Sequence, residues 1–194
     1  KKICPDLVIK STHHHSALER TLITNTDWRL IRKCPAPLLL VKPDPWFNEG
    51  GAVVAVDPMH SNAQHSKLDE SLISGLNMVA KKCEFTPCVF HSYYPFVSTM
   101  FPLGGETKEH MDNIRTQHLD KVRELIQGTP ILEDNIRITE GDLVATLISY
   151  LKEVNANLLV VGALSKNVVE RAIVGNTAER ILEDCPCDVL VIKN

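Results

Sequence analysis

The sequence predicts an α/β fold: an open, parallel five-stranded sheet with helices on both faces, preceded by an incomplete copy of the same fold. Two observations lead to this prediction. Apolar runs of strand length alternate with segments of helical periodicity, the order typical of parallel strands joined by crossover helices. In addition, residues 1–43 match residues 152–194 without a gap when the chain is shifted by 151 positions. A period this long indicates a duplicated domain rather than a short structural repeat.

Identical residues in the two copies fix the domain boundaries. They include Glu19/Glu170, Arg20/Arg171, Asn25/Asn176, Thr26/Thr177, Arg29/Arg180, Cys34/Cys185 and Pro35/Pro186. We therefore expect residues 1–43 to be the C-terminal part of a first domain, residues 44–51 a linker and residues 52–194 a complete second domain. On this interpretation most of the first domain is absent from the sequence.

The strands of the second domain are short apolar runs, and a nearly continuous apolar run is typical of a strand that is buried on both faces. Ala52–Asp57 ends in a polar residue and a proline, and Pro87–Tyr93 is rich in aromatic and β-branched residues. The predicted strands, in chain order, are Ala52–Asp57, Pro87–Tyr93, Ile136–Thr139, Asn157–Val161 and Val189–Ile192.

The helices between these strands show apolar residues on one face. Lys67–Cys83, for example, places Leu68, Leu72, Leu76 and Val79 along a single stripe. The predicted helices, in chain order, are Lys67–Cys83, Thr107–Gln127, Asp142–Val154 and Thr177–Asp184.

The first copy supplies fewer elements. We expect a strand at Asp6–Lys10, a loop, a helix at Thr26–Lys33 and a strand at Leu38–Val41. The connector Lys42–Gly51 contains two prolines and two glycines, which predicts a short hinge that keeps the two domains in contact.

Composition excludes several function classes. The formal net charge is −3 and the pI is near 6.3, so there is no basic footprint for nucleic acid. No apolar stretch approaches the ~20 residues that a membrane-spanning helix needs. Cys185-Pro-Cys187 and Cys83-x4-Cys88 lack the second pair that a tetrahedral metal site requires, and we interpret the six cysteines as reduced thiols of a cytoplasmic protein.

The segment from Gly162 to Thr177 carries the candidate chemistry. A predicted strand ends at Gly162, and Gly175 leads into a predicted helix whose first residues are Asn176 and Thr177. Glycines permit close approach of the backbone to an anion, and the unpaired N–H groups of a helix N-terminus bind negative charge. The same pattern also fits a glycine that merely starts a helix.

The whole chain resembles the universal stress protein family, most closely the tandem, two-domain E-type subgroup. The resemblance is carried by AVVAVD, LLVVGALS, GNTAERIL before Cys-Pro, DVLVIK, and TDWRLIRKCPAPLLLVKP in the first copy. It implies an adenine nucleotide alpha hydrolase-like fold, a stress-response role and an ATP-type ligand, with Asp57 near the adenine and at most slow ATP hydrolysis. It also implies that Leu38–Val41 pairs antiparallel with Val189–Ile192, within one chain or between copies.

Carried onto this sequence, the resemblance and the crevice position predict ten nucleotide-binding residues and no catalytic residue. These are Asp57, Pro58, His91, Gly162, Ala163, Ser165, Lys166, Gly175, Asn176 and Thr177. The chain departs from the family motif G-x2-G-x9-G-[S/T] at Ser165 and Asn176, which should weaken a site more readily than abolish it. For Lys166, an exposed surface role is the alternative. For His91, the alternative is a packed, hydrogen-bonded histidine, and His118 is interpreted as structural.

The first copy has lost all three glycines of the motif, to Ser11, His14 and Thr24, so we expect its site to be inactive for ATP. Its histidine triplet, His13, His14 and His15, fits a solvated loop, an anion contact or a divalent metal site for Zn or Mg. Two alternative functions follow. One is a metal-dependent hydrolase that uses the triplet. The other is a module with decayed ATP sites that binds a partner protein or an apolar metabolite in a pocket bordered by Tyr94, Phe96 and Phe101.

Overall fold

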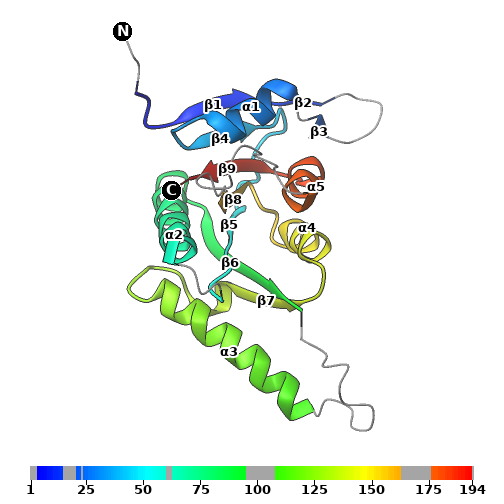
Figure 1. The fold of residues 1–194 in the computed structure, drawn as a ribbon. Helices are drawn as coiled ribbons and strands as arrows, with labels where there is room; N and C mark the ends of the chain where they lie inside the picture. The colour runs from blue at the N-terminus through cyan, green and yellow to red at the C-terminus, as the bar shows by residue number, and fades with distance from the viewer. Residues whose placement is uncertain are drawn as a thin grey trace.

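The computed structural model describes residues 4–14, 21–22, 24–59, 63–94, 108–162 and 176–193, and seven of its strands form one sheet (Figure 1). The order across the sheet is β1-β4-β9-β8-β5-β6-β7. The bounds are β1 Val8–Ser11, β4 Leu38–Val41, β5 Gly51–Ala55, β6 Thr86–Tyr93, β7 Ile136–Glu140, β8 Leu158–Gly162 and β9 Asp188–Ile192. The strands β5 to β9 are parallel to one another, as predicted for the second domain, while β1 and β4 extend the sheet to seven strands.

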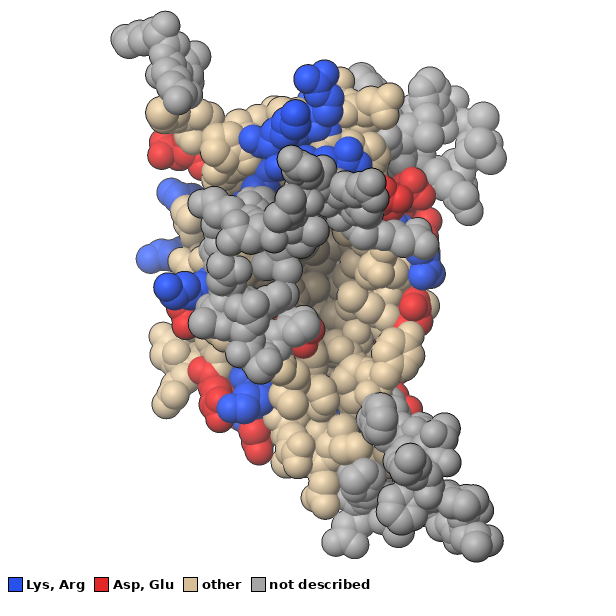
Figure 2. Space-filling model, viewed as in Figure 1, with Lys and Arg blue, Asp and Glu red and all other residues tan. Residues whose placement is uncertain are grey.

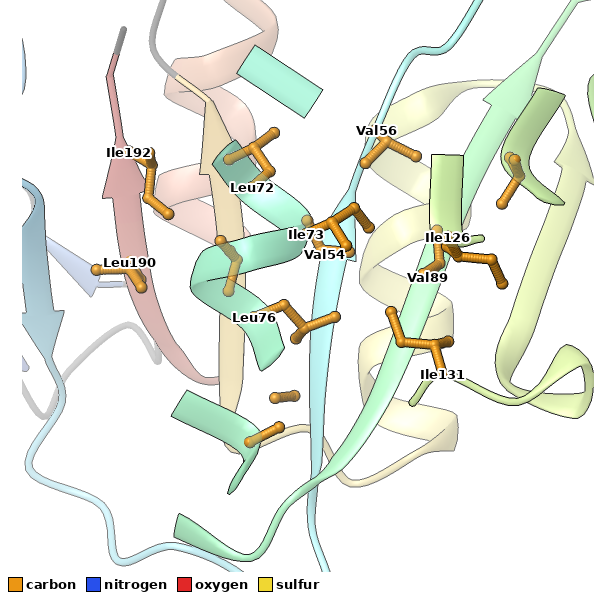
Figure 3. Packing of buried hydrophobic residues seen from close by; sticks show 14 of the residues in the cluster. Val54, Val56, Leu72, Ile73, Leu76, Val89, Ile126, Ile131, Leu190 and Ile192 are labelled. Carbon is orange, nitrogen blue, oxygen red and sulfur yellow. The ribbon is translucent and has the colours of Figure 1, made fainter. Parts of the chain in front are cut away.

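Helices cover both faces of this sheet (Figure 1). Their bounds are α1 Asn25–Lys33, α2 Ala63–Cys83, α3 Lys108–Ile126, α4 Leu143–Glu153 and α5 Asn176–Asp184, with a 3₁₀ turn at Glu133–Asn135. Two apolar clusters form the core, one between the sheet and α2 and α3, the other between the sheet and α1, α4 and α5. Figure 3 shows the first cluster, in which Leu72, Ile73 and Leu76 of α2 pack on β5, β6 and β9.

A two-stranded hairpin occupies the segment of the first copy that was predicted to be a loop. β2 (His13–His14) pairs antiparallel with β3 (Thr21–Leu22). Each strand has only two residues, too few for alternation of apolar and polar side chains to be visible in the sequence. The predicted loop is therefore wrong at these four positions.

The pairing of β4 with β9 is antiparallel, which confirms the strand pairing expected from the resemblance. Its register places Leu39 opposite Leu190, Leu38 opposite Val191 and Leu40 opposite Val189. Leu39 and Leu190 are also equivalent positions of the internal repeat, because they are 151 residues apart. The two copies are thus related by a local two-fold axis that passes between these two leucines.

Two lysines at equivalent positions repeat this symmetry. Lys193 donates from Nζ to the carbonyl oxygens of Cys34 at 2.7 Å and Leu30 at 3.4 Å, at the C-terminal end of α1. Lys42 donates in the same way to the carbonyl oxygen of Cys185, just after α5. A cation at a helix C-terminus satisfies free carbonyl groups and interacts favourably with the helix dipole. Each copy therefore caps a helix of the other.

The connector between β4 and β5 is fixed to the sheet by two buried polar side chains. Asp188 accepts hydrogen bonds from the Lys42 N–H at 2.8 Å and from Trp46 Nε1 at 3.0 Å. Asn157 accepts from the Phe47 N–H at 2.7 Å and donates to the Phe47 carbonyl oxygen at 2.8 Å. Because both side chains lie at the amino ends of buried strands, the connector is held along its length rather than swinging as a hinge.

Candidate functional site

The order of the strands reverses at β5, so that the carboxyl ends of β5 and β8 form a topological switch point. The chain runs from β5 to β6 and β7 on one side, and then returns to β8 and β9 on the other side of β5. In open parallel sheets, ligands bind at the place where the strand order reverses in this way. Asp57 follows β5 by two residues and Gly162 ends β8, so two predicted site residues lie at this switch point.

The predicted site residues at the ends of β5 and β8 differ in how far they are exposed to solvent. Asp57 is exposed and Pro58 is half-buried, while Gly162 is exposed but lies against Leu68 of α2. A Cβ atom added to Gly162 would lie 2.6 Å from Leu68 Cδ2, so a side chain here would require the Leu68 side chain to move. Glycine therefore allows Leu68 of α2 to pack closely on the end of β8.

The helix N-terminus also lies where the sequence predicts it. Asn176 is the first residue of α5, and the Thr177 side chain is exposed beside it. Ala163, Ser165, Lys166 and Gly175 lie outside the described residues.

His91 is buried behind Asp57 and is fully hydrogen-bonded. Only 2% of its surface is exposed, and Nδ1 lies 3.0 Å from the carbonyl oxygen of Val56, the residue before Asp57. Nδ1 must donate to this carbonyl, so Nε2 accepts the hydrogen bond from Nδ1 of His118 at 2.7 Å in the neutral pair. The packed alternative thus describes His91 better than a direct ligand contact, because neither ring nitrogen is available.

His118 also matches its structural interpretation. Its ring stacks on Tyr93 with the centroids 4.5 Å apart, and on His91 with the centroids 4.9 Å apart. The pair braces the backbone at Val56, and through it the position of Asp57.

Burial lowers the pKa of both His91 and His118 below the ordinary value of 6.5, and the nearby Asp57 carboxylate opposes this to a smaller extent. Near pH 6.5, therefore, the two imidazoles bind protons in the unfolded chain but remain neutral in the folded chain. The stabilising contribution is complete above pH 6.5 and is lost as the pH falls towards the lowered pKa values of the folded state.

We therefore expect the free energy of unfolding to fall as the pH drops below about 7, with a slope of at most ~1.4 kcal/mol per pH unit for His91. The share of His118 is smaller, because it is partly exposed. Urea unfolding of the wild type and of His91→Gln checks this, because glutamine keeps a donor for Val56 but does not titrate. Equal pH slopes in the two proteins would contradict the prediction.

The equivalent helix N-terminus of the first copy is occupied by the chain itself. Asp27, the third residue of α1, is completely buried, and its Oδ2 accepts hydrogen bonds from the Thr24 N–H and hydroxyl at 2.8 Å each. Lys10 of β1 pairs with Oδ1 at 3.1 Å. Because of these hydrogen bonds and Lys10, the pKa of Asp27 is lowered although burial alone would raise it. The N-terminus of α1 is thus closed by a capping box between Thr24 and Asp27.

This carboxylate is a functional feature that the sequence analysis missed. The signal was present, because Thr24-x-x-Asp27 has the spacing of a capping box, in which the first and fourth residues bond to each other's backbone N–H. The second copy has Gly175 and Ala178 at these two positions, and cannot form this box.

The structure describes only parts of the two other predicted sites, the histidine triplet and the apolar pocket. His13 and His14 lie in β2, and His15 is outside the described residues; among the described side chains no group of three metal ligands occurs. Tyr94 is exposed and its hydroxyl donates to Asp142 at 3.4 Å, while Phe96 and Phe101 are outside the described residues.

A cavity of about 480 Å³ lies at the opposite, amino ends of β5, β6 and β7, far from the switch point along the strands. Arg137 and Tyr150 line it, with the guanidinium 4.9 Å from the ring centre and paired with Glu153.

Figure 2 shows basic and acidic side chains next to one another along both sides of the molecule. None of the described helices is long and apolar enough to cross a bilayer.

The doubly wound sheet places the chain among open α/β proteins whose strand order reverses at a topological switch point. Comparison with known proteins identifies the family within this class. A model of the universal stress protein family matches residues 1–42 and 88–193, most of the chain. The chain belongs to the universal stress protein family.

Universal stress protein E of Escherichia coli K12 is 33% identical over 193 residues, which cover 97% of this chain and 60% of that protein. The universal stress protein E homolog of Haemophilus influenzae is 28% identical, with 97% and 62% covered. The chain thus spans about three-fifths of the length of these curated relatives.

Solved structures show the same fold. A protein from Pseudomonas aeruginosa PAO1 superposes with a TM-score of 0.78 at 24% identity, covering 97% of this chain and 63% of that one. A universal stress protein from Archaeoglobus fulgidus DSM 4304 gives 0.64 at 17% identity, with 97% and 62% covered. Two universal stress proteins with TM-scores of 0.45 were solved in complex with cAMP and dAMP, and these ligands belong to those proteins.

Proposed function

We propose that this universal stress protein binds an adenine nucleotide of the ATP type at the switch point of residues 52–194, and acts in the cytoplasmic response to stress. One observation carries the proposal: α5, which follows β8 in the chain, has Ala178 at the position where α1 has the carboxylate of Asp27, and the acidic residue of its first turn, Glu179, comes only at the fourth position. The first N–H groups of a helix have no partner within the helix, and together with its dipole they favour a phosphate.

Other residues at the switch point would make the remaining contacts with the nucleotide. Asp57 presents a carboxylate at the end of β5, suited to accept hydrogen bonds from a base or ribose. Gly162 ends β8 next to Leu68 without a side chain of its own. Ser165, Lys166 and Gly175 would complete the phosphate contacts.

We infer one nucleotide site per chain. In the first copy the Thr24 N–H donates to the buried Asp27 carboxylate and the Asp27 N–H donates to the Thr24 hydroxyl, so the chain itself already caps this helix N-terminus. A phosphate there would have to displace a carboxylate that is paired with Lys10, and would meet its negative charge.

We also propose that residues 1–43 belong to a first domain of the same kind, joined by residues 44–51. The local two-fold axis at Leu39 and Leu190 supports this. The exposure of β1 supports it as well, because Ile9 is 63% exposed while its equivalent Val160 is completely buried. A strand and a helix equivalent to β5 and α2 would cover Ile9 in the same way.

Titration calorimetry of the purified chain with ATP, AMP and GTP tests the nucleotide proposal. We expect adenine nucleotides to bind at micromolar concentration with one site per chain, and GTP more weakly. Native mass spectrometry of untreated protein provides a second readout. The proposal fails if no nucleotide binds below millimolar concentration and the untreated protein carries a lipid or nothing.

A further inference from the structure

Two cysteines meet at the corner between α5 and β9. The sulfur atoms of Cys185 and Cys187 are 3.6 Å apart, and the side chains are 1% and 5% exposed. Residues at i and i+2 of a straight strand lie on the same face, but the bend at Pro186 brings these two sulfurs into direct contact. Neither thiol takes part in the proposed nucleotide site.

The internal repeat shows that packing does not require the second thiol. The equivalent corner of the first copy reads Cys34-Pro35-Ala36, so alanine fills the position of Cys187. Both Cys34 and Ala36 are buried there, next to the equivalent lysine contact. A methyl group is therefore enough to fill this position of the corner, and the sulfur of Cys187 is present only in the second copy.

The surroundings distinguish the two thiols. The hydrogen bond with Cys187 lowers the pKa of Cys185, and the Lys42 ammonium, which binds the Cys185 carbonyl oxygen, adds to this effect. The same contact and burial raise the pKa of Cys187. Because the thiolate is the nucleophile, Cys185 is the thiol that reacts first and Cys187 the one that resolves the product.

We propose that Cys185 and Cys187 form a reversible disulfide when the protein meets a hydroperoxide, and that this corner is a redox modification site. The Cys185 thiolate attacks the peroxide oxygen, the O–O bond breaks, and sulfenic acid forms with release of an alcohol, or of water from hydrogen peroxide. Cys187 then attacks the Cys185 sulfur, and water leaves as the S–S bond forms. In sum, two thiols are oxidised and one peroxide is reduced.

The geometry limits both the product and the rate. The sulfurs must approach from 3.6 Å to about 2.05 Å, which the bend at Pro186 has to absorb. Because both thiols are buried, the peroxide must enter through a local opening of the corner, and the reaction should be slower than that of an exposed thiol. The Cys185 carbonyl and the neighbouring Asp188 both hold the connector, so the disulfide would disturb these anchors first.

Peptide mapping after treatment of the folded chain with hydrogen peroxide tests this. Both cysteines lie in one tryptic peptide, residues 181–193. We expect this peptide to lose the mass of two hydrogen atoms and to regain it with a dithiol reductant. In Cys187→Ala, which copies the first corner and should fold, Cys185 should instead stop at sulfenic acid or proceed to sulfinic acid.

Cys34 is the internal control, since it occupies the same corner without a second thiol and should form no disulfide within its peptide. The proposal is overturned if the folded protein forms only disulfides between chains. It is equally overturned if residues 181–193 lose hydrogen mass only after denaturation. Neither outcome depends on nucleotide binding.

Discussion

Replacing Ala178 with aspartate should weaken nucleotide binding by about tenfold to a hundredfold. The new carboxylate would stand at the third position of α5, as Asp27 does in α1. Hydrogen bonds to charged groups are worth about 1.5–3 kcal/mol, which corresponds to this range of affinity. The partners of Asp27 are missing, because Gly175 replaces Thr24 and Val161 replaces Lys10. The negative charge would therefore face the phosphate without compensation.

Calorimetric titration with ATP measures this effect, and Ala178→Asn is the matched control, with nearly the same shape and no charge. An acidic residue in the first turn stabilises a helix by ~0.3–1 kcal/mol, so loss of binding would not result from unfolding. Equal affinity of the aspartate and asparagine variants would mean that the phosphate lies elsewhere.

Replacing Asn157 with alanine should lower the free energy of unfolding by about 2–3 kcal/mol. The substitution removes both side-chain hydrogen bonds to Phe47 and leaves two backbone groups of the connector without these partners. It also leaves a void beside Gly50, where an added Cβ would lie 2.2 Å from Asn157 Nδ2.

Urea denaturation measures this loss, with Asn113→Ala as control. Asn113 is exposed on α3, and its replacement should change the stability by less than about 0.5 kcal/mol. If the two variants are equally stable, the connector is not anchored through Asn157.

The fold could be predicted from the sequence because its signals are local and repeated. Continuous apolar runs identified the five parallel strands, and the ungapped repeat aligned Leu39 with Leu190 before their pairing was known. The observed helices and strands differ from their predicted bounds by a few residues at each end, where fraying and capping decide the limits. The hairpin of β2 and β3 escaped prediction, since two-residue strands carry no periodicity.

The surroundings of the candidate site were less predictable, because they depend on contacts between distant segments. Nothing in the sequence near His91 shows that His118, on a helix 27 residues away, would take up its second ring nitrogen. Asp188 and Asn157 likewise look like ordinary strand residues until the connector is seen to bind them. Asp27 is the exception, because its capping-box spacing with Thr24 can be read directly.

The exchange of lysines across the two-fold axis has a consequence for how the chain melts. Lys193 closes α1 and Lys42 closes the end of α5, so loss of either copy would expose helix carbonyls in the surviving one. The strands that carry these lysines, β4 and β9, are also direct neighbours. We therefore expect the two copies to unfold as a single cooperative unit, because unfolding of one removes a capping lysine and a neighbouring strand from the other.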